Sequence, residues 1–466
     1  MSVSKHVPDR QNGLEQDMMT AAADEVARSP EEPRKVRPQP VHPDERFEAV
    51  DVLRGFALLG ILAMNIVAFA WPFPGYENPH FSGGDTAPNV VAWMINSLLF
   101  SGKMMTLFSM LFGAGLVLMG DRAAARGASL AGTYYRRIFW LLAIGLVHAY
   151  LIWGGDILVT YALCGLLLYL FRRRSPRTLL ILAIIVLLIA SALGYAFLLY
   201  GRFAQEVAAQ VDSNIAAGQE SAEWQVALHA SWNNDLSSFF QPDQSDFHKE
   251  LALYRGGYWG IVAGRVPEVL LFQTYGFLFF MLWGAGGRML LGMALMKWRV
   301  FSGERSWRFY RGLALLGYGC GLPLTVLGAL QLFAHDYNPL RTPVGSLLFG
   351  LGMVPVALGH AAVVMMICKA GVLRWLNDRV AAVGRMALTN YLMQSLLATT
   401  LFYGYGVGLF GHVDRVGLWG IVLLIWAFQL WISPIWLNRH AYGPAEWLWR
   451  SLTYWRWQPL RHRAEG

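Results

Sequence analysis

Long runs of apolar residues, separated by shorter polar segments, make up most of the chain. An apolar helix of about 20 residues is long enough to cross the roughly 30 Å hydrocarbon core of a bilayer. By this criterion the pattern predicts ten membrane-spanning helices. They lie near residues 49–71, 104–120, 137–153, 156–171, 177–200, 268–290, 312–333, 343–368, 383–402 and 417–437. A shorter apolar piece, Val90–Phe100, either lies at the interface before the second span or extends that span.

The composition agrees with a membrane protein and excludes a soluble globular domain. Of the 466 residues, 55% are hydrophobic and only 15% are charged, and the mean hydropathy is +0.38. We therefore predict an all-α fold, a polytopic transmembrane helix bundle whose main partner is the lipid bilayer. The net charge of +8 comes from basic residues in the loops, so it does not indicate a nucleic-acid partner. Cys164, Cys320 and Cys368 lie in apolar runs at unrelated spacings, which predicts neither a disulfide framework nor a metal site.

The distribution of lysine and arginine predicts the orientation of the bundle. Loops on the cytoplasmic side of a membrane protein carry an excess of these residues. In this chain the excess falls in both tails and in the even-numbered loops, for example at Arg122, Arg126, Arg136, Arg137, Arg172, Arg173, Arg174, Arg177, Lys297, Arg299, Arg305, Lys369, Arg374 and Arg379. The short odd-numbered loops hold few basic residues, so both termini are predicted to be cytoplasmic.

Three regions follow from this topology. They are a disordered cytoplasmic tail (1–45), the transmembrane bundle (46–440), and a cytoplasmic interfacial helix and tail (441–466). One extracytoplasmic loop, about 201–267, is long and acidic, and it has patchy helical patterning at Gln205–Ala217 and Glu223–Phe240. A loop of this length either caps a site in the membrane or receives a substrate.

Three polar residues share one side of the first span. Arg54 and Asn65 are eleven positions apart, which places them within about 20° on an ideal helix. Asp51 lies one turn before Arg54 on the same side. Two interpretations remain open: Arg54 extends to the near interface and pairs with Asp51, or the stripe of Asp51, Arg54 and Asn65 lines a substrate site or pathway.

The third and fourth predicted spans form a tight hairpin that turns at Gly154 and Gly155. Each span has only about 16 residues, or roughly 25 Å of helix, so the turn is predicted to lie in a recess below the outer surface. His148 and Asp156 would meet there as a base and its orienting carboxylate. The alternative is a packing histidine and a helix-capping aspartate. Lys103 either faces the same recess or anchors the second span at the interface.

Other intramembrane polar residues give weaker signals. Asn390 and Gln394 are four apart on the ninth span, where they either join helices together or line a substrate pathway. Arg54, Arg288 and Arg385 are predicted near the inner face, where a basic cluster could hold an anionic cofactor such as an acyl-CoA. The excess of positive charge on the cytoplasmic side explains the same residues without a cofactor.

Several common catalytic patterns are missing from the sequence. It contains no Gly-rich phosphate loop, no nucleophile elbow of a Ser–His–Asp hydrolase, no HExxH and no CxxC. We predict instead that its intramembrane glycines allow close helix packing. The clearest examples are Gly113, Gly115, Gly284, Gly286 and Gly287.

Five motifs carry a resemblance to a known family. They are Asp51–Leu62 with Asn65, Lys103 with Leu107–Gly113, His148 with Gly155–Leu158, Gly384–Tyr391, and Gly443–Arg450. Together they resemble the YeiB-like family of bacterial inner-membrane proteins, a domain of unknown function, over about residues 46–458. The resemblance implies a multi-pass protein of the bacterial inner (plasma) membrane.

The Arg-Gly motif of the first span is also similar to that of a wider superfamily of membrane acyltransferases, which take an acyl group from cytosolic acyl-CoA. Many of its O-acyltransferases carry a histidine near the end of the first span, where this chain has Asn65. This departure moves the predicted base to His148, with Asp156 as its orienter.

Our leading hypothesis is an acyltransferase without a metal that moves an acyl group from acyl-CoA to an envelope or exported acceptor, such as a small molecule or a glycan. A transporter or exporter of a small molecule is the alternative from a different class, with the polar residues as its path. A non-enzymatic membrane protein is the third.

Overall fold

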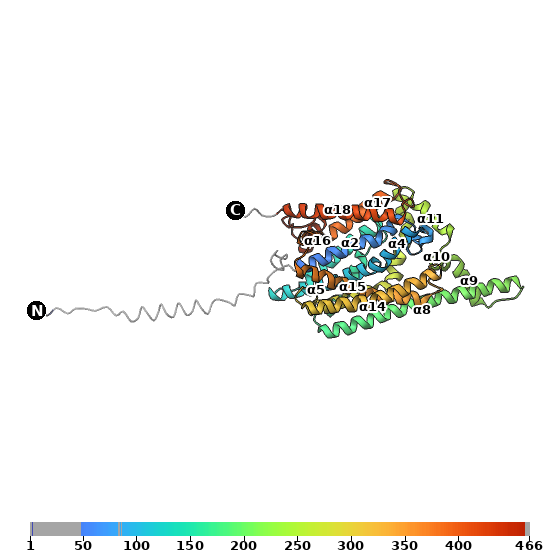
Figure 1. The fold of residues 1–466 in the computed structure, drawn as a ribbon, viewed down its shortest axis with the longest axis horizontal. Helices are drawn as coiled ribbons and strands as arrows, with labels where there is room; N and C mark the ends of the chain where they lie inside the picture. Colours follow the sequence, from blue (N-terminus) through green and yellow to red (C-terminus); the bar gives the residue numbers. More distant parts are fainter. Residues whose placement is uncertain (1, 3–47, 83, 85, 462–466) are drawn as a thin grey trace.

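The computed structural model describes residues 2, 48–82, 84 and 86–461, so the predicted tail at 1–45 falls outside the described residues except for Ser2. The described part is built from helices that run side by side along one direction (Figure 1). No β-strand is formed within these ranges, apart from one isolated bridge between His440 and Arg461. The predicted all-α membrane bundle is therefore confirmed.

In the part of the chain that the structure describes, eight helical segments are long and apolar enough to cross a membrane. They are α2 (Glu48–Ala70), α4–η3–α5 (Ala87–Ile95, Asn96–Phe100 and Lys103–Ala125), α6–η4 (Ala131–Val147 and His148–Ile152), α8 (Pro176–Ala216), α12–η7–α13 (Tyr258–Leu271, Phe272–Met281 and Leu282–Lys297), α14 (Trp307–Ala334), α15 (Pro343–Ala370) and α18 (Arg415–Arg439). The spans predicted at 156–171 and 383–402 correspond to shorter helices: α7 (Leu158–Leu168) with η5 (Tyr169–Phe171), and α17 (Ala387–Phe402).

Several bounds differ from those predicted. Helix α8 continues for 41 residues to Ala216, about 60 Å, so the first part of the predicted outer loop extends the span without a break. Helix α12 starts at Tyr258, inside that loop, and the ninth span is interrupted at Met386 by the end of α16 (Arg374–Arg385). The apolar pattern of the sequence does not reveal where these helices begin and end, because a helix can continue from an apolar stretch into a polar one with the same backbone geometry.

Short helices occupy most of the remaining connections. The outer loop forms α9 (Glu223–Ser231), η6 (Trp232–Leu236), α10 (Ser237–Phe240) and α11 (Gln244–Tyr254), in line with the predicted short helices. These elements gather at the end of the bundle where α8 projects (Figure 1). Two further short elements, α3 (Pro74–Glu77) and η2 (Pro79–Ser82), follow α2, and α19 (Pro444–Tyr454) ends the helical part of the chain.

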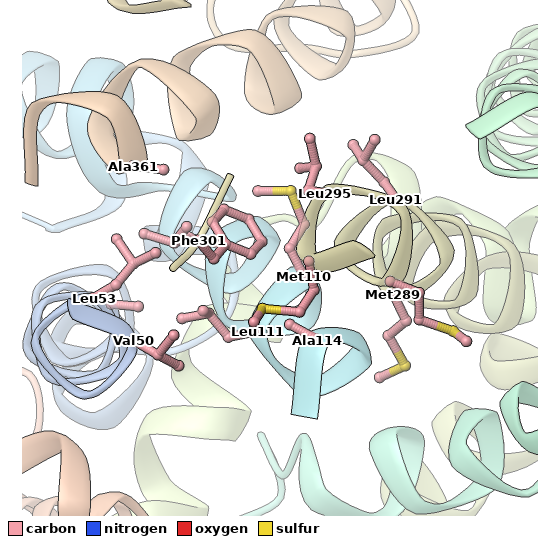
Figure 2. Close-up of a cluster of buried hydrophobic side chains, with 14 of the residues drawn as sticks. Val50, Leu53, Met110, Leu111, Ala114, Met289, Leu291, Leu295, Phe301 and Ala361 are labelled. Atoms are coloured by element: carbon pink, nitrogen blue, oxygen red, sulfur yellow. The ribbon is translucent and has the colours of Figure 1, made fainter. Parts of the chain in front are cut away.

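Close contacts between helix backbones fix the centre of the bundle. Helices α5 and α13 cross at Gly113 and Gly292, where a Cβ would collide with the backbone of the other helix. Helices α2 and α16 cross in the same way at Gly55 and Gly384. Small residues permit such approaches, as predicted for Gly113. Around the crossings lies the main apolar core, part of which Figure 2 shows; its members include Leu53, Met110, Leu111, Met289 and Phe301.

The other predicted packing glycines divide into two groups. Gly287 packs against Leu187 of α8, as expected. Gly115 and Gly286 have open space where a Cβ would be, and Gly284 meets only the end of Arg288 at 3.8 Å, so close packing does not explain these three.

The hairpin between α6 and α7 is covered from the side of the outer loop by α12. Arg265, only 2% exposed, donates to the carbonyl oxygens of Tyr150 and Ile152, both at 2.8 Å. These bonds satisfy carbonyls that the end of a helix leaves without partners. Trp153 stacks on Phe69 of α2 with 4.0 Å between ring centroids. The turn is thus held inside the bundle.

The C-terminal helix α19, predicted to lie in the interface, docks onto the bundle. Glu446 accepts hydrogen bonds from the backbone N–H groups of Leu388 (2.6 Å) and Thr389 (3.2 Å) and from the Thr389 hydroxyl. Its carboxylate therefore caps the start of α17. Trp449 donates to the Arg137 carbonyl at 2.8 Å and also stacks under the Arg137 guanidinium.

The orientation of the bundle can be tested with single cysteines in a background without Cys164, Cys320 and Cys368. Ser129 and Gln219 are exposed and lie in the connections at opposite ends of the bundle. We expect an impermeant thiol reagent to label Gln219→Cys in intact cells and Ser129→Cys only after the membrane is opened. Labelling of the Ser129 site in intact cells would contradict the predicted cytoplasmic position of the end of the bundle at which α19 lies.

The cap on α17 gives a stability prediction. We expect Glu446→Ala to lower the free energy of unfolding by about 1–2 kcal/mol, since removing a helix cap leaves backbone donors unpaired. Burial raises the pKa of the Glu446 carboxyl above its ordinary value, so a neutral side chain is tolerated there. Glu446→Gln keeps an acceptor oxygen and is the matched control, with stability close to wild type. Thermal unfolding of the purified protein in one detergent compares the three proteins.

Candidate functional site

His148 and Asp156 form the predicted pair inside the α6–α7 hairpin. His148 is the first residue of η4, directly after α6, and its Nδ1 lies 2.8 Å from Asp156 Oδ1. Both side chains have 0% exposure. The other carboxylate oxygen accepts from the backbone N–H of Val159 at 2.8 Å, which also caps the first turn of α7. The aspartate therefore holds the imidazole in one orientation with Nδ1 as the protonated nitrogen.

A serine that the sequence analysis did not single out completes this arrangement. Ser395 of α17 has its Oγ 2.9 Å from His148 Nε2 and is 1% exposed. Because Nδ1 donates to the carboxylate, Nε2 is the acceptor and the serine hydroxyl donates to it. Asp156, His148 and Ser395 thus form a continuous carboxylate–imidazole–hydroxyl chain. We refer to it as the buried triad.

The signal for Ser395 was present in the sequence but incomplete. The residue directly follows Gln394 in an apolar span, which marks it as an intramembrane polar group. Its partner is 247 positions earlier in the chain, and no spacing rule connects the two.

A tyrosine separates the buried triad from the main cavity of the bundle. The Tyr391 ring lies 5.0 Å from the His148 ring, between centroids, and Tyr391 is one helical turn before Ser395. Its hydroxyl accepts from the backbone N–H of Ile157 at 3.4 Å, a long bond. Tyr391, Ile157 and Tyr161 all line the cavity, and Tyr391 is therefore placed between the open space and the His148 ring.

The cavity has a volume of about 290 Å³ and lies among α2, α5, α6, α7, α16, α17 and α19. Its apolar walls include Phe112, Leu116, Ile138 and Leu141. Gly115 is also part of the wall, which explains the open space beside it. The cavity thus extends from a wall that α19 partly forms to Tyr391, the residue that covers the buried triad.

Five arginines line the same cavity: Arg54, Arg122, Arg137, Arg385 and Arg450. Two carboxylates accompany them, and both are already engaged: Asp51 pairs with Arg54 at 2.7 Å, and Glu446 caps α17. The excess of guanidinium groups favours an anionic ligand. Arg54 pairs with Asp51 and both residues line the cavity, whereas Asn65, the third residue of the predicted stripe, does not.

Arg288 is not part of this basic cluster. Helix α13 continues to Lys297, nine residues or roughly 13 Å beyond Arg288, so its predicted position at the inner end of the span is wrong. The span was predicted to end at 290, too early by seven residues. The side chain is half-buried and donates to Met353 Sδ at 3.8 Å, and it does not line the cavity.

Lys103 and Asn65 also lie elsewhere. Lys103 is completely buried, donates to the Ser97 carbonyl at 2.6 Å and lies over the Phe349 ring at 4.1 Å. It contacts neither His148 nor Asp156, so the structure does not bring it into the predicted recess. Asn65 is half-buried on α2 and does not line the cavity.

The amides of α17 join helices together. Asn390 donates to the Ser433 hydroxyl of α18 at 3.1 Å, and Gln394 donates to the Gln429 side chain of α18 at 2.9 Å. Gln394 also reaches the Leu58 carbonyl of α2 at 3.5 Å. Both are buried and neither lines the cavity, which favours the structural interpretation. These bonds fix the rotation of α17 and so the direction in which Ser395 points.

Comparison with known proteins gives a family but no activity. The model of a family described as "Protein of unknown function (DUF418)" matches residues 295–456. The uncharacterized protein YxaH of Bacillus subtilis is 33% identical over 435 residues, which cover 92% of this chain and 99% of that protein. The uncharacterized protein YeiB of Escherichia coli is 33% identical over 419 residues, 88% of this chain and 96% of that one.

A third relative, an uncharacterized 39.9 kDa protein of Bacillus acidopullulyticus, is 26% identical over 92% of this chain and 99% of its own length. No solved structure matches the chain significantly. The two relatives at 33% identity cover nearly the whole of this chain and carry the assignment. The chain belongs to the YeiB-like (DUF418) family of proteins of unknown function.

Proposed function

We propose that the protein is an acyltransferase of a bacterial plasma membrane. The donor is an acyl-CoA or a similar thioester with an anionic head, and the acceptor is a hydroxyl or amine of an envelope or exported molecule. One observation carries the proposal: a single cavity leads from a cluster of arginines to the tyrosine that covers a buried His–Asp pair.

The cavity suits the two ends of such a donor. Guanidinium groups bind phosphates through paired N–H donors, and Arg385 and Arg450 at the α16 and α19 walls are free of carboxylate partners among the described residues. Farther in, the walls are apolar and accept an acyl chain. An amphiphilic anion would therefore enter with its acyl end directed at Tyr391.

The buried pair supplies the base. With Nδ1 bonded to Asp156, the Nε2 of His148 carries no proton and accepts the Ser395 hydroxyl, so it can take up a proton, and the carboxylate stabilises the imidazolium that forms. A positioned base contributes about 10²–10⁴-fold to a proton-transfer step. The acceptor would approach from the outer side of the hairpin, where Arg265 and Trp153 cover the turn.

The role of His148 can be tested with labelled acetyl-CoA and the purified protein in nanodiscs. We expect His148→Gln to lower the transfer of label by at least about 100-fold, and Asp156→Asn to lower it less, because the base remains. His360 is the matched control: it is also buried and bonded through both nitrogens, to Tyr318 and Leu99, but lies away from the cavity. Transfer by His148→Gln at the wild-type rate would contradict the proposal.

The donor site can be tested by filling it. A Cβ at Gly115 would meet nothing within 4 Å, and Gly115 lines the cavity, so Gly115→Leu should fold normally yet weaken acetyl-CoA binding at least about tenfold. Gly319→Leu is the matched control, since this exposed glycine of α14 also has open space around it and lies outside the cavity. Calorimetric titration of both variants measures the effect, and equal affinities would place the donor elsewhere.

A further inference from the structure

We infer that Ser395 is a nucleophile that carries the acyl group as an acyl-serine between donor and acceptor. The inference rests on the proposed acyl transfer and adds to it a covalent intermediate and the residue that bears it. It follows from the order of groups in the buried triad, their burial, and their position relative to the cavity.

The geometry of Ser395 is that of an activated hydroxyl. Serine is a weak nucleophile unless an adjacent base takes its proton as it attacks, and the base is most effective when a carboxylate holds it in place. Here the hydroxyl-to-imidazole distance is 2.9 Å and the imidazole-to-carboxylate distance is 2.8 Å. Both ring nitrogens are therefore used in the way that nucleophilic catalysis requires.

Other buried hydroxyls in the described part of the chain lack this arrangement. Ser109 bonds to the Met105 carbonyl and the Tyr161 hydroxyl, and Ser433 bonds to the Asn390 side chain. The Tyr318 hydroxyl does bond to His360, but the other nitrogen of that ring faces the Leu99 carbonyl and not a carboxylate. The carboxylate–imidazole–hydroxyl order thus distinguishes Ser395 from them.

The position of Ser395 explains why a covalent intermediate is useful. It lies eight residues along α17 from Ala387 at the cavity wall, a rise of about 12 Å. At 1% exposure it has no room for donor and acceptor together. A residue that first takes the acyl group from one side and then passes it to the other removes the need for both to bind at once.

Tyr391 lines the cavity and packs beside His148, so access from the cavity to Ser395 requires Tyr391 to move. Its hydroxyl is held by the 3.4 Å bond to Ile157, which is weak at that distance. Rotation of this side chain would bring the cavity and the Ser395 hydroxyl into contact, because the two residues are one turn apart on the same helix.

The chemistry balances in two steps. In the first, Ser395 Oγ attacks the thioester carbonyl and its proton passes to His148 Nε2; the new C–O bond forms, the C–S bond breaks, and the proton leaves with the thiol. In the second, the acceptor hydroxyl or amine gives its proton to His148 Nε2 and attacks the acyl-serine. The ester bond to Ser395 then breaks, and His148 Nε2 returns the proton to Ser395 Oγ. Asp156 stays ionised throughout.

The experiment is to trap the intermediate. The wild-type protein in nanodiscs is mixed with isotopically labelled acetyl-CoA without acceptor, quenched in acid and digested, and the α17 peptide is sequenced by mass spectrometry. We expect one acetyl group on Ser395. Ser395→Ala should reduce the label on that peptide by at least about 100-fold, and His148→Gln should do the same. Ser191→Ala is the matched control, since this hydroxyl bonds to the Leu187 carbonyl of α8, and it should retain the label.

Two further measurements separate this inference from the proposed function. Ser395→Cys should keep the acyl group as a thioester that neutral hydroxylamine releases. This variant tests the same position if the Ser395→Ala protein fails to fold. A fluorophosphonate probe should label Ser395 in the wild type and not in His148→Gln, whatever the natural donor is.

The outcomes are distinct. Transfer to an acceptor at the wild-type rate by a folded Ser395→Ala protein overturns the inference and leaves the proposed function standing. Acetylation of His148 in place of Ser395 also overturns it. Fluorophosphonate labelling of Ser395 that depends on His148, without any reaction with acetyl-CoA, supports the nucleophile and overturns the proposed donor.

Discussion

The structure of the site depends on the need to satisfy a carboxylate that is buried inside a membrane bundle. Asp156 has no exposed side-chain surface, so both of its oxygens must find donors within the protein. One takes the imidazole N–H of His148 and the other takes the backbone N–H of Val159. These two bonds set the orientation of the ring, the start of α7 and the geometry of the hairpin. The remaining carbonyls of the turn are then satisfied by Arg265 from α12.

A second carboxylate has the same effect at the other end of the cavity. Glu446 caps the start of α17 with an oxygen from α19, and so ties the last helix to the helix that carries Tyr391 and Ser395. The amides of Asn390 and Gln394 fix the rotation of α17 against α18. Together these bonds position Ser395 through polar contacts in the first half of α17.

The parts of the site formed by polar residues close together along the chain could be predicted from the sequence. The parts formed by residues far apart along the chain could not. The His148–Asp156 pair and the Asp51–Arg54 pair each lie within one hairpin or one helical turn, so local geometry was enough. Ser395 and the α19 wall of the cavity depend on contacts across hundreds of residues. Arg288 was misplaced for a different reason: apolar patterning gives the middle of a span well, but its end depends on how the helix packs.

The cavity also changes how the membrane barrier is distributed. Open space in the cavity comes within one side chain, Tyr391, of the His148 imidazole. In a membrane, an electric potential falls mainly across the parts of a protein that water does not reach, so water in this cavity would place the imidazole inside the remaining field. Moving one elementary charge through 100 mV corresponds to about 2.3 kcal/mol. A proton that moved through the imidazole toward the far side would then cross part of any voltage across the membrane that holds the protein.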